Sequence, residues 1–134
     1  LANDLCPIVC CDDTMGRRIA YDQKIHWVVN RILADVKDLS EDEVAKVTIA
    51  YEPNWAIGTG QSADPDQAEE GCYLIRQTIS DMYGQAVANE IRILYGGSVT
   101  TKNVGALMAQ PDIDGALVGV SSLDPTTFLQ IVNH

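Results

Sequence analysis

Hydrophobic and polar positions along the chain fall into two alternating kinds of segment. Short continuous apolar runs predict strands of a parallel sheet covered on both faces, at 6–11, 47–51, 91–95 and 115–119. The segments between and after them predict helices, at 21–36, 65–83, 102–109 and 125–132. Within 21–36 the apolar residues recur every three or four positions, which is typical of a helix with one buried stripe. Four strand-helix units in series indicate an α/β fold with parallel pairing.

Local signals place the helix starts. Asp64-Pro65 and Asp124-Pro125 each combine an N-cap residue with a proline in the first turn. Ser40 and Glu43 have the spacing of a capping box, which predicts a short helical turn before the second strand.

The segment 51–60, Y-E-P-N-W-A-I-G-T-G, is the part of the chain with the clearest chemistry. It places a carboxylate, Glu52, at the carboxyl end of a strand. Pro53 lacks an N–H, so we expect it to leave the sheet at once and to act as a stiff hinge. Glycines in the following loop allow that loop to fold closely over a bound molecule. We expect a lid that excludes water from Glu52, formed by Pro53, Trp55, Ala56, Ile57, Gly58, Thr59 and Gly60.

This segment resembles the strand-six and lid motif of the triosephosphate isomerase family. The resemblance extends over residues 1–134 and implies strand-helix units five to eight, the second half of a TIM (β/α)8 barrel. The chain is then a single partial domain, since its 134 residues fall well short of the roughly 250 of such a barrel. Leu1 stands where an initiator Met is expected, so part of the protein is expected to be missing. By itself, a four-strand sheet would leave two long edges and an uncovered inner face.

The activity implied by the resemblance is interconversion of dihydroxyacetone phosphate and glyceraldehyde 3-phosphate through an enediolate. Glu52 matches the base that moves the proton between neighbouring carbons. No metal or organic cofactor is implied. Two alternatives are a non-catalytic half-barrel that only binds phosphate, and a different phosphate-binding barrel enzyme, which the lid motif disfavours.

The substrate's phosphate group is expected at the carboxyl ends of the last two strands. Ser98, at the end of Y-G-G-S, matches a phosphate-binding position of the family, as do Gly119 and Val120 after the next strand. Gly58 matches the lid amide that clamps the phosphate. A single glycine turn is weak support for a phosphate site, whereas three such elements at the family's spacing are much stronger support.

The chain also departs from the family pattern. Val120 stands where the family usually has glycine, so its side chain crowds the expected phosphate site. Asn54 replaces the aliphatic residue of the amino hinge, and Gln61-Ser62 replaces the usual start of the carboxyl hinge. The segment C-C-D-D at 10–13 departs from a C-I-G-E-like pattern, keeping Cys10 and an acid at Asp13.

Several family residues have no counterpart in this chain. The substrate-binding Asn and Lys belong to strand one, the electrophilic His to strand four, and the main dimer loop follows strand three. The expected partners are therefore a small phosphorylated triose and the missing N-terminal half, with a homodimer formed by the full-length protein.

Composition limits the other function classes. A net charge of -10 argues against nucleic acid and acidic membranes as partners. It also argues against a phosphorylated substrate, unless backbone N–H groups at a helix amino end, which need no side-chain charge, hold the phosphate. His26 and His134 are isolated, so a zinc site is not favoured. The four cysteines indicate reduced, mostly buried thiols in a cytoplasmic protein, and no apolar run is long enough to span a bilayer.

Overall fold

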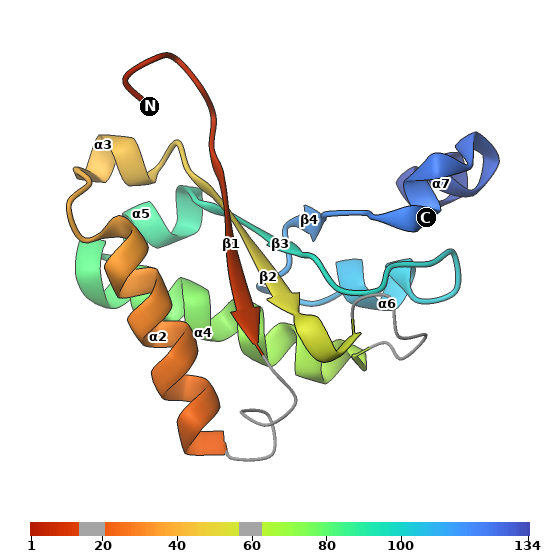
Figure 1. The fold of residues 1–134 in the computed structure, drawn as a ribbon, viewed down its shortest axis with the longest axis horizontal. Helices are drawn as coiled ribbons and strands as arrows, with labels where there is room; N and C mark the ends of the chain where they lie inside the picture. Colours follow the sequence, from red (N-terminus) through yellow and green to blue (C-terminus); the bar gives the residue numbers. More distant parts are fainter. Residues whose placement is uncertain (14–20, 57–62) are drawn as a thin grey trace.

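Four parallel strands form one sheet whose spatial order follows the chain, β1-β2-β3-β4 (Figure 1). The computed structural model describes residues 1–13, 21–56 and 63–134. The strands are β1 (Ile8–Asp13), β2 (Thr48–Pro53), β3 (Arg92–Tyr95) and β4 (Gly115–Ala116). Each neighbouring pair is parallel, so each connection must return the chain to the start of the next strand. The predicted α/β class is confirmed.

Helices fill the connections, and α2 packs alongside α4 (Figure 1). The helices are α2 (Tyr21–Val36), α3 (Glu41–Val44), α4 (Pro65–Tyr83), α5 (Gln85–Glu90), α6 (Val104–Met108) and α7 (Pro125–Val132). Two short 3-10 turns, η1 (Asn54–Ala56) and η2 (Val120–Leu123), follow β2 and β4. The predicted bounds of α2, α4 and α7 are confirmed, whereas α6 is shorter than predicted and α5 was not predicted at all.

Side-chain caps begin the helices at the predicted residues. Asp64 accepts the N–H of Gln67 at 2.8 Å at the start of α4, and Asp124 accepts the N–H of Thr127 at 2.7 Å at the start of α7. Before α3 the Glu43 carboxylate accepts both the backbone N–H of Ser40, at 2.9 Å, and its hydroxyl, at 2.8 Å. These bonds satisfy groups that a helix start otherwise leaves without partners.

The core lies between one face of the sheet and the helices. Ile49 and Tyr51 of β2 are buried there beside Ile93 and Tyr95 of β3. The α4 residues predicted to face the sheet are fully buried: Ala68, Cys72, Ile75 and Ile79.

The opposite face of the sheet is open. Ile8 is 50% exposed, and Arg92, aligned with it through Thr48 of β2, is also exposed. The prediction that the strands are covered on both faces is therefore wrong for these positions, because the described helices cover only one face.

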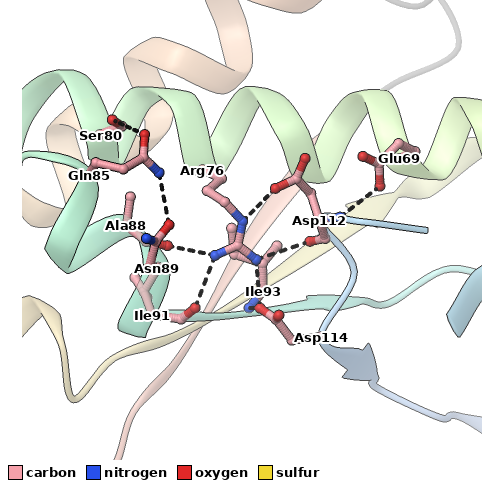
Figure 2. Close-up of polar contacts among 10 residues, drawn as sticks. All are labelled: Glu69, Arg76, Ser80, Gln85, Ala88, Asn89, Ile91, Ile93, Asp112 and Asp114. Atoms are coloured by element: carbon pink, nitrogen blue, oxygen red, sulfur yellow. Dashed lines mark hydrogen bonds and ion pairs between the residues drawn. The ribbon is translucent and has the colours of Figure 1, made fainter. Parts of the chain in front are cut away.

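An ion-pair network joins α4 to the sheet at the end where β3 begins (Figure 2). Arg76 donates from Nε to Asp112 at 2.6 Å and from Nη2 to Asp114 at 2.7 Å. Asp114 also accepts the N–H of Ile93 at 2.7 Å, and Glu69 accepts the N–H of Asp112 at 3.2 Å. The network fixes the approach to β4 at the end of the sheet away from the strands' carboxyl ends.

The structure corrects the prediction for Pro53. Pro53 is the last residue of β2 and pairs with Asp13 of β1, so it does not leave the sheet at once. The pairing of β2 with β3 has already ended at Tyr51 and Tyr95, so no β3 ladder bond is lost through the missing N–H.

The structure also corrects the expectation for the cysteines. Cys11 and Cys72 are buried, but Cys6 and Cys10 are exposed. Cys6 precedes β1, which begins at Ile8 rather than at the predicted position 6, and Cys10 lies on the strand face that no described helix covers. Across the described parts of the chain, no helix has both the length and the apolar character needed to cross a membrane.

Candidate active site

A cavity of about 390 Å³ opens at the carboxyl ends of β2, β3 and β4. The described residues that line it are Glu52, Gly96, Gly97, Ser98, Val99, Leu117, Val118, Gly119, Val120 and Ser121. Four residues predicted for the site, Glu52, Ser98, Gly119 and Val120, are thus brought together from three separate segments. The geometry follows from topology, since parallel strands present their carboxyl ends at the same edge.

Glu52 is half-buried, and β1 supplies its nearest thiol. The register aligns Asp12 with Glu52, and Cys10 lies one pleat earlier on β1, so alternation puts Cys10 on the strand face of Glu52. Although Cys10 is largely exposed, the partial desolvation of its thiol raises the thiol's pKa, and its hydrogen bond to the Glu52 carboxylate raises that pKa further. Cys10 therefore remains a neutral donor to Glu52 at neutral pH.

Gly96 restricts Glu52 from the side of β3. The Gly96 N–H donates to the carbonyl of Tyr51 at 2.8 Å, which continues the contact between the two strands beyond the last ladder pair. A Cβ on Gly96 would lie 2.8 Å from Cγ of Glu52, closer than such atoms approach. The Cγ methylene of Glu52 occupies space that a glycine at position 96 leaves free.

The two loops that follow β3 and β4 are linked at the cavity. Asn103 donates to the carbonyl of Ser98 at 2.9 Å and accepts the N–H of Thr100 at 2.7 Å. The Ser121 hydroxyl donates to the carbonyl of Val99 at 3.0 Å, so η2 is tied to the loop after β3. Sequence reasoning missed Asn103 and Ser121, which have no motif signal of their own.

Val120 is 82% exposed at the rim of the cavity. No Lys or Arg is among the described lining residues, so backbone N–H groups and the Ser98 hydroxyl are the donors available there for an anion. Within the described ranges, no cluster of three or more His, Cys, Asp or Glu side chains could hold a metal ion.

The described residues include only part of the predicted lid. Pro53, Trp55 and Ala56 are described and buried, with η1 continuing directly from β2. Ile57, Gly58, Thr59 and Gly60 lie outside the described residues, so their predicted roles stay predictions.

Comparison with known proteins decides the family. A family profile described as triosephosphate isomerase matches residues 1–134. The chain belongs to the triosephosphate isomerase family. Relatives named triosephosphate isomerase include those of Pediococcus pentosaceus, 49% identical over 132 residues, and Lactiplantibacillus plantarum, 51% identical over 132 residues. That of Lactobacillus gasseri is 51% identical over 133 residues.

The alignments cover this chain almost completely but only part of each relative. The alignments with the Pediococcus pentosaceus and Lactiplantibacillus plantarum proteins each cover 98% of this chain and 52% of the relative. The alignment with the Lactobacillus gasseri protein covers 99% of this chain and 53% of the relative. The chain thus spans about half the length of the curated triosephosphate isomerases that it matches.

Proposed function

We propose that this chain is the part of a triosephosphate isomerase barrel that carries the base and the phosphate cradle, units five to eight. In the complete barrel it interconverts dihydroxyacetone phosphate and glyceraldehyde 3-phosphate. The observation that supports this most directly is the shared cavity, in which the Glu52 carboxylate meets the loops of Ser98 and Gly119.

In the proposed reaction Glu52 takes a proton from the hydroxyl-bearing carbon beside the substrate carbonyl and returns it to the former carbonyl carbon, while the hydroxyl proton of the first carbon moves to the former carbonyl oxygen through groups of the complementary half. The carboxylate becomes a carboxylic acid while the substrate is an enediolate, and it is a carboxylate again when the product forms. Cys10 and Gly96 contact Glu52 from the two neighbouring strands. Their part is to restrict the carboxylate to the cavity, since proton transfer requires close and reproducible geometry.

The substrate's phosphate is held by backbone N–H groups around Ser98, Gly119 and Val120, with a contribution from Gly58. Converging N–H dipoles bind anions without cationic side chains. This suits a chain with a net charge of -10 and a cavity whose described lining has neither Lys nor Arg.

The proposed partner is the complementary half with strands one to four, which supplies the Lys and His that stabilise the enediolate oxygen. The open sheet face and the sheet edges at β1 and β4 support this partner. Apolar side chains beyond β4 are also exposed, at Val120, Leu123, Leu129 and Val132. Exposed apolar surface of this extent is typical of a surface that another segment covers. The complete protein is proposed to be a cytoplasmic homodimer.

The experiment compares Glu52→Gln with Glu90→Gln, both in the chain assembled with its complementary half. Glu90 is exposed on α5 and serves as the matched control. Glu52→Gln should lower kcat about a hundred- to ten-thousand-fold, and Glu90→Gln should not change it. Near-normal turnover of Glu52→Gln would remove Glu52 from the mechanism. Phosphate binding without turnover by the unmodified assembly would favour the non-catalytic module instead.

A further inference from the structure

Asp12 joins three segments at the edge of the sheet that carries Glu52. Its Oδ2 accepts the side-chain N–H of Asn54, in η1, at 3.2 Å. Trp27 of α2 donates its indole N–H to the carbonyl of Asp12 at 3.0 Å and lies 3.4 Å from its Oδ1. The end of β1 is therefore linked both to α2 and to the residue that follows β2.

These bonds lie next to Glu52, the proposed base. Asp12 is the register partner of Glu52, and Asn54 follows Glu52 by two positions with only Pro53 between them. Beyond the bond from the Gly96 N–H to the Tyr51 carbonyl, the last residues of β2 have ladder partners only on β1 among the described residues. The Asp12–Asn54 bond adds a side-chain link where the backbone ladder ends.

Both ends of this bond are departures from the family pattern. Asp12 stands at the glycine position of the C-I-G-E-like pattern, and Asn54 stands at the aliphatic position of the hinge. A glycine has no acceptor side chain and an aliphatic residue has no donor, so the family pattern cannot form this bond. The two departures are complementary to each other, one an ionised acceptor and the other an amide donor.

We propose that Asp12 and Asn54 are paired positioning residues, in which the Asp12 carboxylate holds Asn54 and thereby fixes the end of β2 that presents Glu52. The proposal rests on the proposed isomerase function. Neither side chain is among the described residues that line the cavity, so both act through the backbone on either side of Pro53.

A double-mutant cycle in the assembled protein tests the pairing. The variants are Asp12→Ala, Asn54→Val, the two combined, and Asp12→Asn, whose amide oxygen can still accept from Asn54. We expect Asp12→Ala and Asn54→Val each to lower kcat roughly fivefold, the effect of losing one hydrogen bond, with KM changed less than kcat because the Ser98 and Gly119 loops of the phosphate cradle lie elsewhere. The combined variant should lose no more than either single variant, and Asp12→Asn should restore most of kcat.

The outcomes separate this proposal from the function on which it rests. Additive losses, a change in KM alone, or equal losses for Asp12→Asn and Asp12→Ala would overturn the positioning role while leaving the isomerase intact. Absence of turnover in the unmodified assembly would overturn the proposed function, and the positioning role with it. A second readout is the solvent exchange of the Asn54 side-chain amide by NMR. It should speed up in Asp12→Ala but not in Asp12→Asn, and unchanged exchange in Asp12→Ala would show that the bond does not hold Asn54.

Discussion

Gly96 and Glu52 lie against each other across neighbouring strands. A Cβ placed on Gly96 would be 2.8 Å from Cγ of Glu52 and 3.3 Å from the carbonyl oxygen of Tyr51. The Tyr51 oxygen belongs to the backbone and is bonded to the Gly96 N–H, so it cannot withdraw without cost. The side chain of Glu52 is the part that would move.

Gly96→Ala should therefore lower kcat in the assembled protein by roughly tenfold to a hundredfold, because the carboxylate is displaced from its working geometry. Binding of inorganic phosphate should change little, since the cradle loops do not depend on the position of Glu52. Steady-state kinetics and a phosphate titration check both expectations. An unchanged kcat would mean that Glu52 does not need the space at Gly96.

Gly71 and Tyr51 make a similar close approach in the core. A Cβ on Gly71 would lie 2.3 Å from the ring of Tyr51, which is a core residue only 1% exposed. We expect Gly71→Ala to lower the free energy of unfolding by about 1–3 kcal/mol, the usual cost of overpacking. Gly105→Ala, in α6, is the matched control, because a Cβ there meets nothing within 4 Å.

The control should be stabilising by about 0.5–1 kcal/mol, since alanine is the better helix former. Denaturant unfolding of both variants gives the comparison. Equal free energies of unfolding for the two variants would show that α4 can shift away from β2 at no cost.

Glu69 should make stability depend on pH. Burial raises the pKa of Glu69 above its ordinary value and outweighs the N–H of Asp112, which lowers it. A carboxyl whose pKa is raised on folding stabilises the fold below its unfolded pKa of about 4.3, and this contribution is lost as the pH rises through the folded pKa. Glu69→Gln cannot ionise and keeps an oxygen for the N–H of Asp112.

The unfolding temperature of the unmodified chain should therefore fall relative to that of Glu69→Gln as the pH is raised from about 4 to neutrality. Glu90→Gln, at an exposed position, should show no such divergence. Thermal unfolding at several pH values measures the divergence between each variant and the unmodified chain. A difference between the unmodified chain and Glu69→Gln that does not vary with pH would contradict the expectation.

Local chemistry accounts for the parts of the fold that the sequence predicts well. The starts of α4 and α7 depend on Asp64 and Asp124, whose capping bonds are made to residues three positions away. The extent of each strand in the sheet depends on residues that are far apart in the sequence. β4 is predicted over 115–119 but pairs only at Gly115 and Ala116, because β3 ends at Tyr95 and offers no further ladder partner.

The predictions for the site divide in the same way, into those that follow from the sequence and those that need the folded structure. That Glu52, Ser98 and Gly119 share a cavity follows from placing each at the end of a parallel strand. The contacts around Glu52 could not be predicted, since they depend on register and on side-chain rotamers. Asp12 and Asn54 appear in the sequence only as two unrelated departures, and their hydrogen bond emerges once β1 lies beside β2.

The central claim, that this chain is the base-carrying half of an isomerase, is tested most directly by complementation. The measurement is a coupled assay of triose-phosphate isomerisation with the purified 134-residue chain, alone and mixed with strands one to four of a relative such as that of Lactiplantibacillus plantarum. The chain alone should show negligible turnover, because each missing electrophile costs about 2–4 kcal/mol of transition-state stabilisation. The mixture should turn over substrate, and Glu52→Gln should lower that activity about a hundred- to ten-thousand-fold. Substantial turnover by the chain alone, or a stable complex of the two halves that remains inactive, would contradict the account.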